Sequence, residues 1–442
     1  MDSGRPTEVA DSAQLVPLRR NRDFTLLWTG QATSMLGTQI SSLAYPLLIL
    51  AATGSAAQAG IVASVTLIGT LVFLLPAGVV ADRHPRKRIM VTASLVQMIA
   101  GATVVPAVLT HHVFVIHLAV VGCVQGIASA FYLGASRGAT RRIVARGQLP
   151  EAMAATQARD RAATMLGPPA GGALFDAGRS LPFAVDSVSF GAIALAAALI
   201  RKPLDPDQPP AREPLGRSLT KGMRFIAQQP FLRMFAVWTS LLNGVVFGIR
   251  LTIIVVARNR GATPFEIGTL FTISAGCGLA GALLAVRLSR LAGPRLLTLL
   301  SAWLFPACAA GMFFAPSVWV IAALAGVTGF AIMPVNVLMS ARSAQITPHH
   351  LQAQTGNTLQ LCYQGLASFT PAIFGALTDK IGAYPVILVA AVVYGALAIW
   401  LQFNRELHHL GDRLPDPGNE EEIPDRAGGN PQPATRRKGQ AA

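Results

Sequence analysis

A short polar segment between two apolar stretches carries the densest group of side chains capable of chemistry. It holds one carboxylate, Asp82, four residues after Gly78, followed by basic residues at Arg83, Arg86 and Lys87. Removing a carboxylate at the end of an apolar helix from water costs free energy, so the group requires a cation or a helix N-terminus as a partner. The segment therefore predicts an electrostatic contact at the point where one apolar helix ends.

A second segment combines small residues with proline. Gly167, Pro168, Gly171 and Gly172 lie within one apolar stretch. Glycine lets two helix backbones approach closely, and proline removes a backbone hydrogen bond and allows a kink. The segment predicts tight helix packing, either as a specific device or as a general packing face.

Two carboxylates lie inside apolar stretches, where ionised groups are expensive and default to functional candidates. Asp186 lies about 9 Å along its helix, at about 1.5 Å per residue, and is a candidate for proton coupling. A structural role near the adjacent turn is the alternative. Asp160 stands between Arg159 and Arg161. It is a second coupling candidate, or else a charge-paired anchor or part of a gate.

The elements that position these groups are membrane helices. The 442 residues are 52% hydrophobic and 13% charged, whereas soluble domains carry about 25% charged residues. A helix needs about 20 apolar residues to cross the hydrocarbon core. Twelve spans are expected, at residues 24–50, 58–81, 89–109, 113–136, 154–176, 181–200, 231–256, 264–287, 294–314, 316–339, 356–378 and 382–403.

Basic residues concentrate in alternate loops, whereas the other loops hold only Arg179, Arg258, Arg260 and Lys380. The positive-inside rule then places both termini in the cytoplasm of a multi-pass protein of the cytoplasmic membrane. The expected organisation is an N-terminal cytoplasmic tail (1–23), a six-helix bundle (24–200), a cytoplasmic linker (201–230), a second six-helix bundle (231–403) and a disordered tail (404–442). Residues 215–229 of the linker form an amphipathic pattern, which predicts a helix on the membrane surface or a solvated connector.

The two halves repeat one another at a constant offset in residue number. This offset places Pro168 on Pro371 and Asp176 on Asp379. Such a repeat predicts two pseudo-symmetric bundles. The same offset aligns Gly78 with Gly281 and Asp82 with Ala285, which makes the electrostatic contact one-sided.

The segment from Gly78 to Arg88 resembles the signature loop of the major facilitator superfamily. The segment 163–172 is similar to the antiporter motif of its exporters, with alanine at the first position. Three further segments resemble the macrolide- and siderophore-efflux branch of the superfamily: 21–24, 52–56 and 186–190. The resemblance as a whole extends over about residues 20–404. The sequence departs from this branch at Thr92, Ala93 and Ser94, where an aspartate is usual, and at Pro85, where glycine is common.

The resemblance implies that Asp82 contacts the start of the eleventh span, near Leu351–Gln354, when the cytoplasmic side is closed. It also implies a central cavity lined mainly by spans 1, 4, 7 and 10. Arg250 is the ionised side chain in that set, and it either contacts an anionic group of cargo, pairs with a carboxylate or reaches the outer interface. The candidate cavity residues are Gln39, Tyr45, Gln125, Asn243, Arg250 and Asn336.

Together these features predict proton-linked export of a small amphipathic or lipophilic molecule such as an antibiotic, drug or siderophore. Import of a small solute is the alternative, and a non-transporting receptor, scaffold or enzyme is a weaker one. The sequence has no P-loop, so the expected energy source is the proton gradient rather than ATP. The four cysteines are expected to be packing residues rather than metal ligands. The protein is expected to act as a monomer among lipids, without a cofactor, catalytic residues or nucleic acid.

Overall fold

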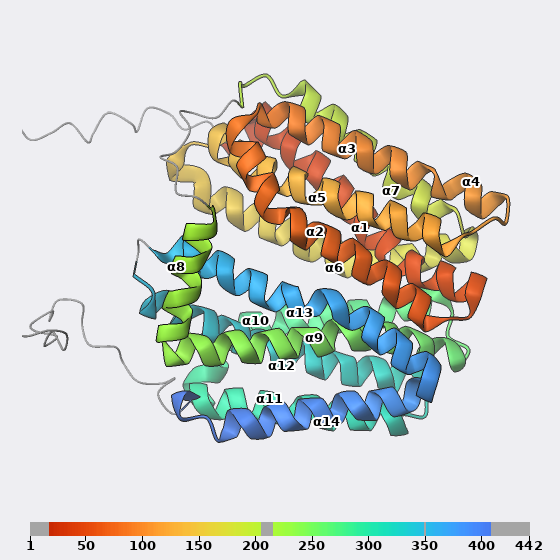
Figure 1. Ribbon diagram of the computed structural model, residues 1–442, viewed down its shortest axis with the longest axis vertical. Coiled ribbons are helices and arrows are strands. Elements are labelled where there is room, and N and C mark those ends of the chain that lie inside the picture. Colours follow the sequence, from red (N-terminus) through yellow and green to blue (C-terminus); the bar gives the residue numbers. More distant parts are fainter. Residues whose placement is uncertain (1–16, 205–214, 349–350, 408–442) are drawn as a thin grey trace, which may run out of the picture.

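The computed structural model describes residues 17–204, 215–348 and 351–407, so much of the expected tails and of the linker lies outside the described residues. Within these ranges the chain is helical and contains no strand. Two bundles of long, roughly parallel helices lie side by side, one before the linker and one after it (Figure 1). The all-helical class and the arrangement in two six-span bundles are confirmed.

The first two helices of the N-terminal bundle begin at residues whose side chains cap them. The Asn21 side chain accepts a hydrogen bond from the Phe24 amide, and the Ser55 hydroxyl accepts one from the Gln58 amide. Such caps satisfy amides that have no partner within the helix. The helices of this bundle are α1 (Arg22–Thr53), α2 (Ala56–Arg83), α3 (Arg86–Ala102), α4 (Val104–Leu109), α5 (Val115–Ile143), α6 (Leu149–Ala177) and α7 (Leu181–Leu199).

The C-terminal bundle follows a short helix, α8 (Leu215–Gln228), that runs across the ends of the long helices (Figure 1). We call this end of the molecule the linker end and the opposite one the far end. A capping box between Thr263 and Glu266 starts the second helix of the bundle. The helices are α9 (Pro230–Asn259), α10 (Pro264–Ala292), α11 (Pro294–Phe314), α12 (Val318–Ile346), α13 (Gln352–Ile381) and α14 (Ala383–Gln402).

Ten helical segments are long and apolar enough to cross a membrane, with α3 and α4 counted as one. The two other expected spans, α6 and α13, have the length but not the apolar character. Residues near the linker end explain this, because α6 contains Arg159, Asp160 and Arg161 and α13 contains several glutamines and threonines. Both helices pack in the bundles beside the others (Figure 1).

The spacing of the internal repeat changes within the chain. Helices α5 and α12 end at Ile143 and Ile346, so their residue numbers differ by the same amount as those of Pro168 and Pro371. At the far end, however, Gly60 packs on the Pro371 carbonyl and Gly268 packs on the Pro168 carbonyl. Because the two prolines match, Gly60 must match Gly268, and α2 and α10 therefore correspond at a wider spacing. The expected match of Gly78 with Gly281 and of Asp82 with Ala285 is wrong.

The counterpart of Asp82 is Arg290, a cation, so the second half still lacks this aspartate. Five extra residues of the N-terminal half account for the change, and they lie between the starts of α3 and α5. There the expected third span is broken at Thr103, because Pro106 has no amide hydrogen to bond the Ala102 carbonyl. The extra length projects at the far end as α4 and the turn after it (Figure 1).

Helix α8 confirms the helix expected in the linker, but only part of its apolar face is free to contact the membrane. Gly222 packs against α13 at the Gln354 carbonyl and the Thr358 hydroxyl. Ile226 is buried in the core of the C-terminal bundle, whereas Met223 is 61% exposed. Part of the apolar stripe of α8 therefore covers protein rather than lipid.

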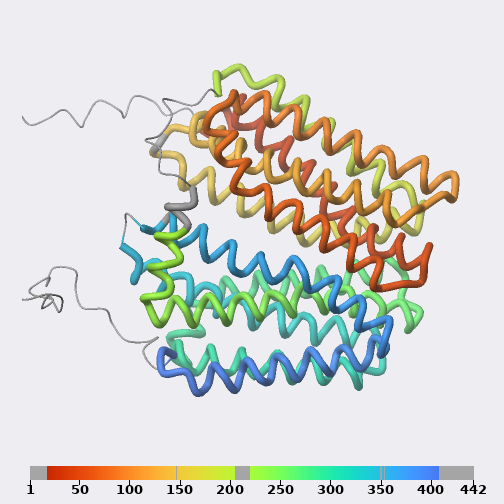
Figure 2. Tube along the Cα trace, in the orientation of Figure 1, coloured from red at the N-terminus to blue at the C-terminus, as the bar shows by residue number. Residues whose placement is uncertain are grey.

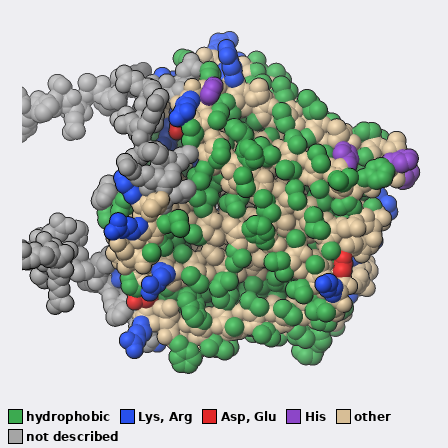
Figure 3. Space-filling model, viewed as in Figure 1, with side chains coloured by type: hydrophobic (Ala, Val, Ile, Leu, Met, Phe, Trp, Pro, Cys, Tyr) green, Lys and Arg blue, Asp and Glu red, His purple; other side chains and the backbone are tan. Residues whose placement is uncertain are grey.

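Large apolar side chains are exposed around the sides of both bundles, such as Val188, Leu283 and Val392. Figure 3 shows hydrophobic side chains spread over the middle of one face, with most lysines and arginines toward its ends. Contiguous apolar surface of this kind is typical of contact with lipid.

Candidate functional site

The two bundles enclose a cavity of about 1240 Å³. Its walls come mostly from the N-terminal bundle, and α9 and Pro371 complete it. Figure 2 shows the bundles diverging toward the linker end and converging at the far end. The lining extends to Arg141, Leu149 and Met153 near the linker end, so the cavity opens there.

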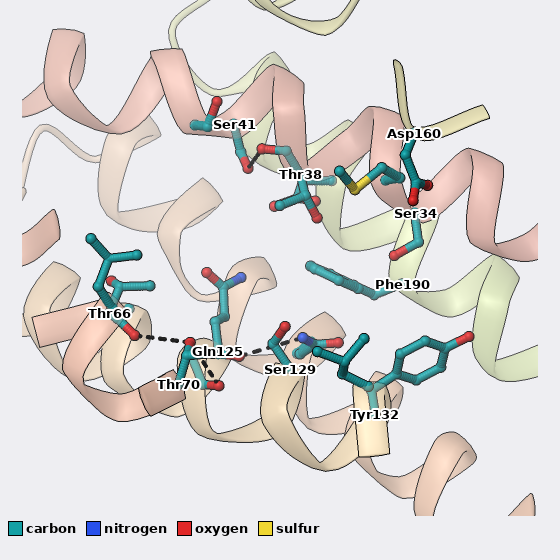
Figure 4. A pocket seen from close by; sticks show the side chains of 18 of the residues that line it. Ser34, Thr38, Ser41, Thr66, Thr70, Gln125, Ser129, Tyr132, Asp160 and Phe190 are labelled. Carbon is teal, nitrogen blue, oxygen red and sulfur yellow. Dashed lines mark hydrogen bonds between the residues drawn. The ribbon is translucent and has the colours of Figure 1, made fainter. Parts of the chain in front are cut away.

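The N-terminal bundle supplies most of the polar groups that line the cavity, among apolar side chains such as Leu67 and Phe190. Ser34, Thr38 and Ser41 of α1 face Thr70 and Gln125 of α2 and α5 across the cavity (Figure 4). The wall formed by α9 is apolar apart from Arg250 and includes Phe247, Leu251 and Ile254. The cavity therefore offers hydrogen-bond partners on one side and apolar contact on the other.

Three of the six expected cavity residues, Tyr45, Gln125 and Arg250, line this cavity. The Tyr45 hydroxyl donates a hydrogen bond to Gln125 Oε1 at 3.2 Å. The guanidinium of Arg250 lies 4.7 Å from the centre of the Phe271 ring, a cation–π distance. No acidic side chain pairs with Arg250 among the described residues.

The other three expected residues lie elsewhere. Gln39 lines neither cavity, because its Cβ lies where α1 packs against Gly167 of α6. Asn243 and Asn336 line a separate cavity within the C-terminal bundle.

The expected lining, mainly by spans 1, 4, 7 and 10, is partly wrong, since α2, α6 and α7 also contribute and no described residue of α12, the tenth span, lines this cavity. Thr66 and Thr70 of α2 were missed for this reason. Two hydroxyls four residues apart in an otherwise apolar helix were the available signal, because such residues share a face.

Asp186 is 3% exposed and lines the large cavity. It reaches this position because Gly37 allows α1 and α7 to touch, so that the side chain lies beside Ser41. Its Oδ1 has no hydrogen-bond partner among the described residues. An unpaired buried carboxylate is costly in its charged form, so this group is suited to exchanging a proton.

Asp160, the second coupling candidate, is already paired. Arg159 donates hydrogen bonds to Asp160 Oδ1 at 2.8 and 3.0 Å and to Gln31 Oε1 at 2.6 Å. The pair lines the cavity toward its open end, where it ties α6 to α1. This geometry matches the expected charge-paired anchor.

The segment that contains Asp82 lies at the linker end and makes no bridge between the bundles in the described part of the chain. Asp82 is 57% exposed, with Arg86 Nη2 at 3.8 Å. A Cβ at Gly78 would meet nothing within 4 Å. Arg83 is exposed, and Lys87 donates to the Ile200 carbonyl at 2.8 Å. The expected contact with Leu351–Gln354 belongs to a state in which the linker end is closed, so it stays a prediction.

The glycines of the antiporter-like segment allow close contacts on two sides of α6. Gly167 and Gly171 pack against Gln39 and Ile40 of α1 within the bundle. Gly172 packs against the Pro264 carbonyl at the start of α10, across the bundle interface. The segment therefore contributes to closure of the far end.

Two carboxylates join the bundles at the far end. Asp379 of α13 accepts hydrogen bonds from the Ser55 hydroxyl and from the amides of Ala56 and Ala57 at the start of α2. Asp176 of α6 accepts one from the Phe265 amide at the start of α10, at 3.2 Å. Partial burial acts to raise the pKa of the Asp379 carboxyl, but its hydrogen bonds from Ser55, Ala57 and Ala56 outweigh this and hold that pKa below its usual range.

A family model described as Major Facilitator Superfamily matches residues 27–256 and 239–434. The chain belongs to the major facilitator superfamily. It is 27% identical over 390 residues to the enterobactin exporter EntS of Shigella boydii serotype 18, covering 86% of this chain and 91% of that protein. The superfamily expected from the sequence is thus confirmed.

Solved structures of other transporters share this fold. A bacterial homologue of the human lysosomal transporter Spinster, solved inward-facing and unoccupied, matches with a TM-score of 0.70 and 14% identity over 90% of this chain and 98% of its own. A bacterial homologue of the iron transporter ferroportin in an inward-facing state matches with a TM-score of 0.67 and 17% identity, covering 87% and 99% of the two chains. This chain is a multi-pass membrane transporter of the same fold.

Proposed function

We propose that the protein exports a small amphipathic organic molecule, of siderophore type, from the cytoplasm by alternating access. The observation that carries the proposal is the large cavity, which is open at the linker end and closed at the far end. Similarity to enterobactin exporters over most of the chain supports outward transport.

The linker end is assigned to the cytoplasm. Arg83 lies there as the last residue of α2, Arg86, Lys87 and Arg88 as the first residues of α3, and Arg141 and Arg142 at the adjacent end of α5. The positive-inside rule favours the cytoplasmic side for such basic segments. Cargo then enters the cavity from the cytoplasm or the inner leaflet and leaves when the far end opens.

The walls of the cavity favour an amphipathic cargo with an acidic group. Its polar side chains can pair hydroxyls or amides, while Phe247, Leu251 and Ile254 cover an apolar face. Arg250 supplies a cation without an acidic partner among the described residues, and a guanidinium binds carboxylate-like groups well.

Energy comes from the proton gradient, with Asp186 as the coupling group. Its Oδ1 is buried and unpaired within the described structure, whereas Asp160 is held by Arg159. Protonation of Asp186 from the outside and its release toward the cytoplasm would couple inward proton flow to outward cargo flow.

Secretion of enterobactin by cells that lack their own exporter tests this function. Expression of the protein should raise enterobactin in the medium over an empty-vector control. A panel of lipophilic compounds, assayed for cellular accumulation, covers other cargo. Unchanged levels of enterobactin and of every compound contradict export, and increased accumulation supports the importer alternative.

A further inference from the structure

A second cavity, of about 540 Å³, lies inside the C-terminal bundle near the linker end. It is formed by α9, α12 and α13. None of its lining residues is charged, and most are hydroxyl, amide or small side chains. The polar groups used below are those of Thr239, Asn243, Asn336, Ser343, Thr355 and Tyr363.

This second cavity is the pseudo-symmetric counterpart of the open end of the large cavity. Helices α12 and α13 correspond to α5 and α6 at the spacing that relates Ile143 to Ile346, and α9 corresponds to α1 at the wider spacing of the first helices. Lining residues correspond accordingly: Thr239 matches Gln31, Ser343 matches Thr140 and Tyr363 matches Asp160, and each partner lines its own cavity.

The two cavities differ in charge at these matched positions. The large cavity carries Arg137, Arg141 and Asp160 where the second has Ser340, Ala344 and Tyr363. A buried ion in the second cavity would find no side chain of opposite charge on its walls, and an unpaired buried charge is strongly unfavourable. The walls of the second cavity therefore favour neutral groups over ions.

Several polar atoms around the second cavity lack partners in the described structure. Thr355 is 1% exposed, and its hydroxyl makes no hydrogen bond. The Thr239 hydroxyl is also buried without a partner. The Asn243 side chain donates to the Thr239 carbonyl at 2.8 Å, which leaves its own oxygen as an acceptor. Buried polar groups in folded proteins are normally paired, so these hydroxyls and this amide point to a bound polar group.

We propose that the second cavity is a binding subsite for an uncharged group bearing hydroxyl or amide functions, while the large cavity takes the charged part of the same cargo. The subsite rests on the proposed transport function. The two sites adjoin along α9, where Asn243 of the second cavity and Phe247 of the large one lie about one helical turn apart. A single extended cargo can then contact both bundles.

Filling the second cavity tests this proposal. A Cβ at Gly356 would meet nothing within 4 Å, so Gly356→Leu fills the space without a backbone clash. Gly365→Leu is the matched control, because Gly365 lies on the same helix, has equally open space and lines neither cavity. Thr355→Val removes one hydroxyl at nearly constant volume and serves if Gly356→Leu folds poorly.

The probes are salicylamide, which is neutral at pH 6.5, and salicylate, its anionic analogue. Affinity is measured on the purified full-length protein in lipid nanodiscs. We expect Gly356→Leu to weaken salicylamide binding at least about tenfold and Thr355→Val to weaken it several-fold, with Gly365→Leu unchanged. Salicylate binding should persist in all three variants, which also reports correct folding.

An unchanged salicylamide affinity in both Gly356→Leu and Thr355→Val would overturn the subsite, as would absence of salicylamide binding to the unmodified protein. Export of enterobactin is measured in parallel. If the variants bind salicylamide as the unmodified protein does while enterobactin is still exported, only the subsite is rejected. If the unmodified protein exports no enterobactin, the proposed function is rejected.

Discussion

Asp379 Oδ2 accepts a 2.6 Å hydrogen bond from the Ser55 hydroxyl, and this contact joins the last turn of α13 to the start of α2 in the opposite bundle. The same carboxylate also receives two amides of α2, where the positive end of the helix dipole favours an anion. Asp176, the matched carboxylate of the N-terminal bundle, makes the corresponding contact with α10. The far end is thus closed by two related caps, each supplied by the other bundle.

Neutralising the stronger cap should loosen the far end. Asp379→Asn removes the charge from three hydrogen bonds that cross the interface but keeps one oxygen as an acceptor. Hydrogen bonds to a charged group contribute about 1.5–3 kcal/mol each, and neutral ones about 0.5–1.5 kcal/mol. We expect the population with the far end open to rise roughly three- to tenfold, and Asp176→Asn to have a smaller effect. Spin-label distances at the far end, between α2 and α13 and between α6 and α10, measure this. Glu266→Gln, which changes a cap inside one bundle, should leave the distance distribution unaltered.

Acid should weaken the same contact only at low pH. The pKa of Asp379 is depressed when the far end is closed, whereas in the open state it takes its ordinary value of about 3.9. The cap therefore stabilises closure fully above that ordinary value, and this contribution is lost as pH falls through the lower pKa. Far-end distances should stay constant from pH 8 to about pH 5, and widen only below about pH 4. A pH response that survives in Asp379→Asn must come from another group.

Removing the titratable group at Asp186 should separate binding from coupling. Asp186→Asn keeps the size of the side chain and cannot bind or release a proton in the same way. We expect cargo binding to remain within a few-fold, and efflux driven by an imposed pH gradient in proteoliposomes to be abolished. Asp160→Asn serves as the comparison, because that carboxylate is held by Arg159. Retained pH-driven efflux in Asp186→Asn would show that another group couples.

Arg250 should discriminate between acidic and neutral cargo. Arg250→Gln removes the cation that the described structure places in the cavity without an acidic partner. Salicylate affinity should fall by about tenfold or more, since charge-assisted hydrogen bonds contribute about 1.5–3 kcal/mol, while salicylamide affinity should hardly change. Equal losses for both probes would indicate a packing role against Phe271 instead.

Asp82 should matter for turnover and not for the state with the linker end open. In that state its ion-pair partner in the described structure is Arg86, at 3.8 Å, in a half-exposed setting where such a pair contributes little. Asp82→Asn should therefore leave cargo affinity and membrane expression unchanged, yet reduce transport several-fold by weakening closure of the linker end. Wild-type transport rates in this variant would contradict the expected contact between Asp82 and Leu351–Gln354 in the state with the linker end closed.

Much of the architecture follows from the sequence, because a run of apolar residues long enough to cross the bilayer indicates a span and positive charge reveals the alternation of loops. The faces of the helices are harder to assign. Gln39 and Tyr45 are both polar positions of α1, yet one packs against Gly167 and the other lines the cavity. Only the packing of neighbouring helices decides between such positions.

The register of the repeat is hard to read from the sequence for a related reason. A single spacing fits α5–α7 and α12–α14, but it does not extend to α2, because the N-terminal half contains additional residues between α2 and α5. Contacts at the far end reveal the correct register, because Gly60 and Gly268 each meet the carbonyl of a matched proline. Short matches of small residues in apolar helices cannot establish a register without such contacts.

The two contacts that close the far end are held by unequal numbers of hydrogen bonds, so one side of the exit should open more easily than the other. In the described residues four hydrogen bonds join α2 to α13, including one from the Ala372 amide to Ser64, whereas two join α6 to α10. When the bundles separate at the far end, the contact between α6 and α10 should break first, while α2 and α13 stay together and act as the hinge. Cargo would then depart past α6 and α10, and residues along that flank would meet it last.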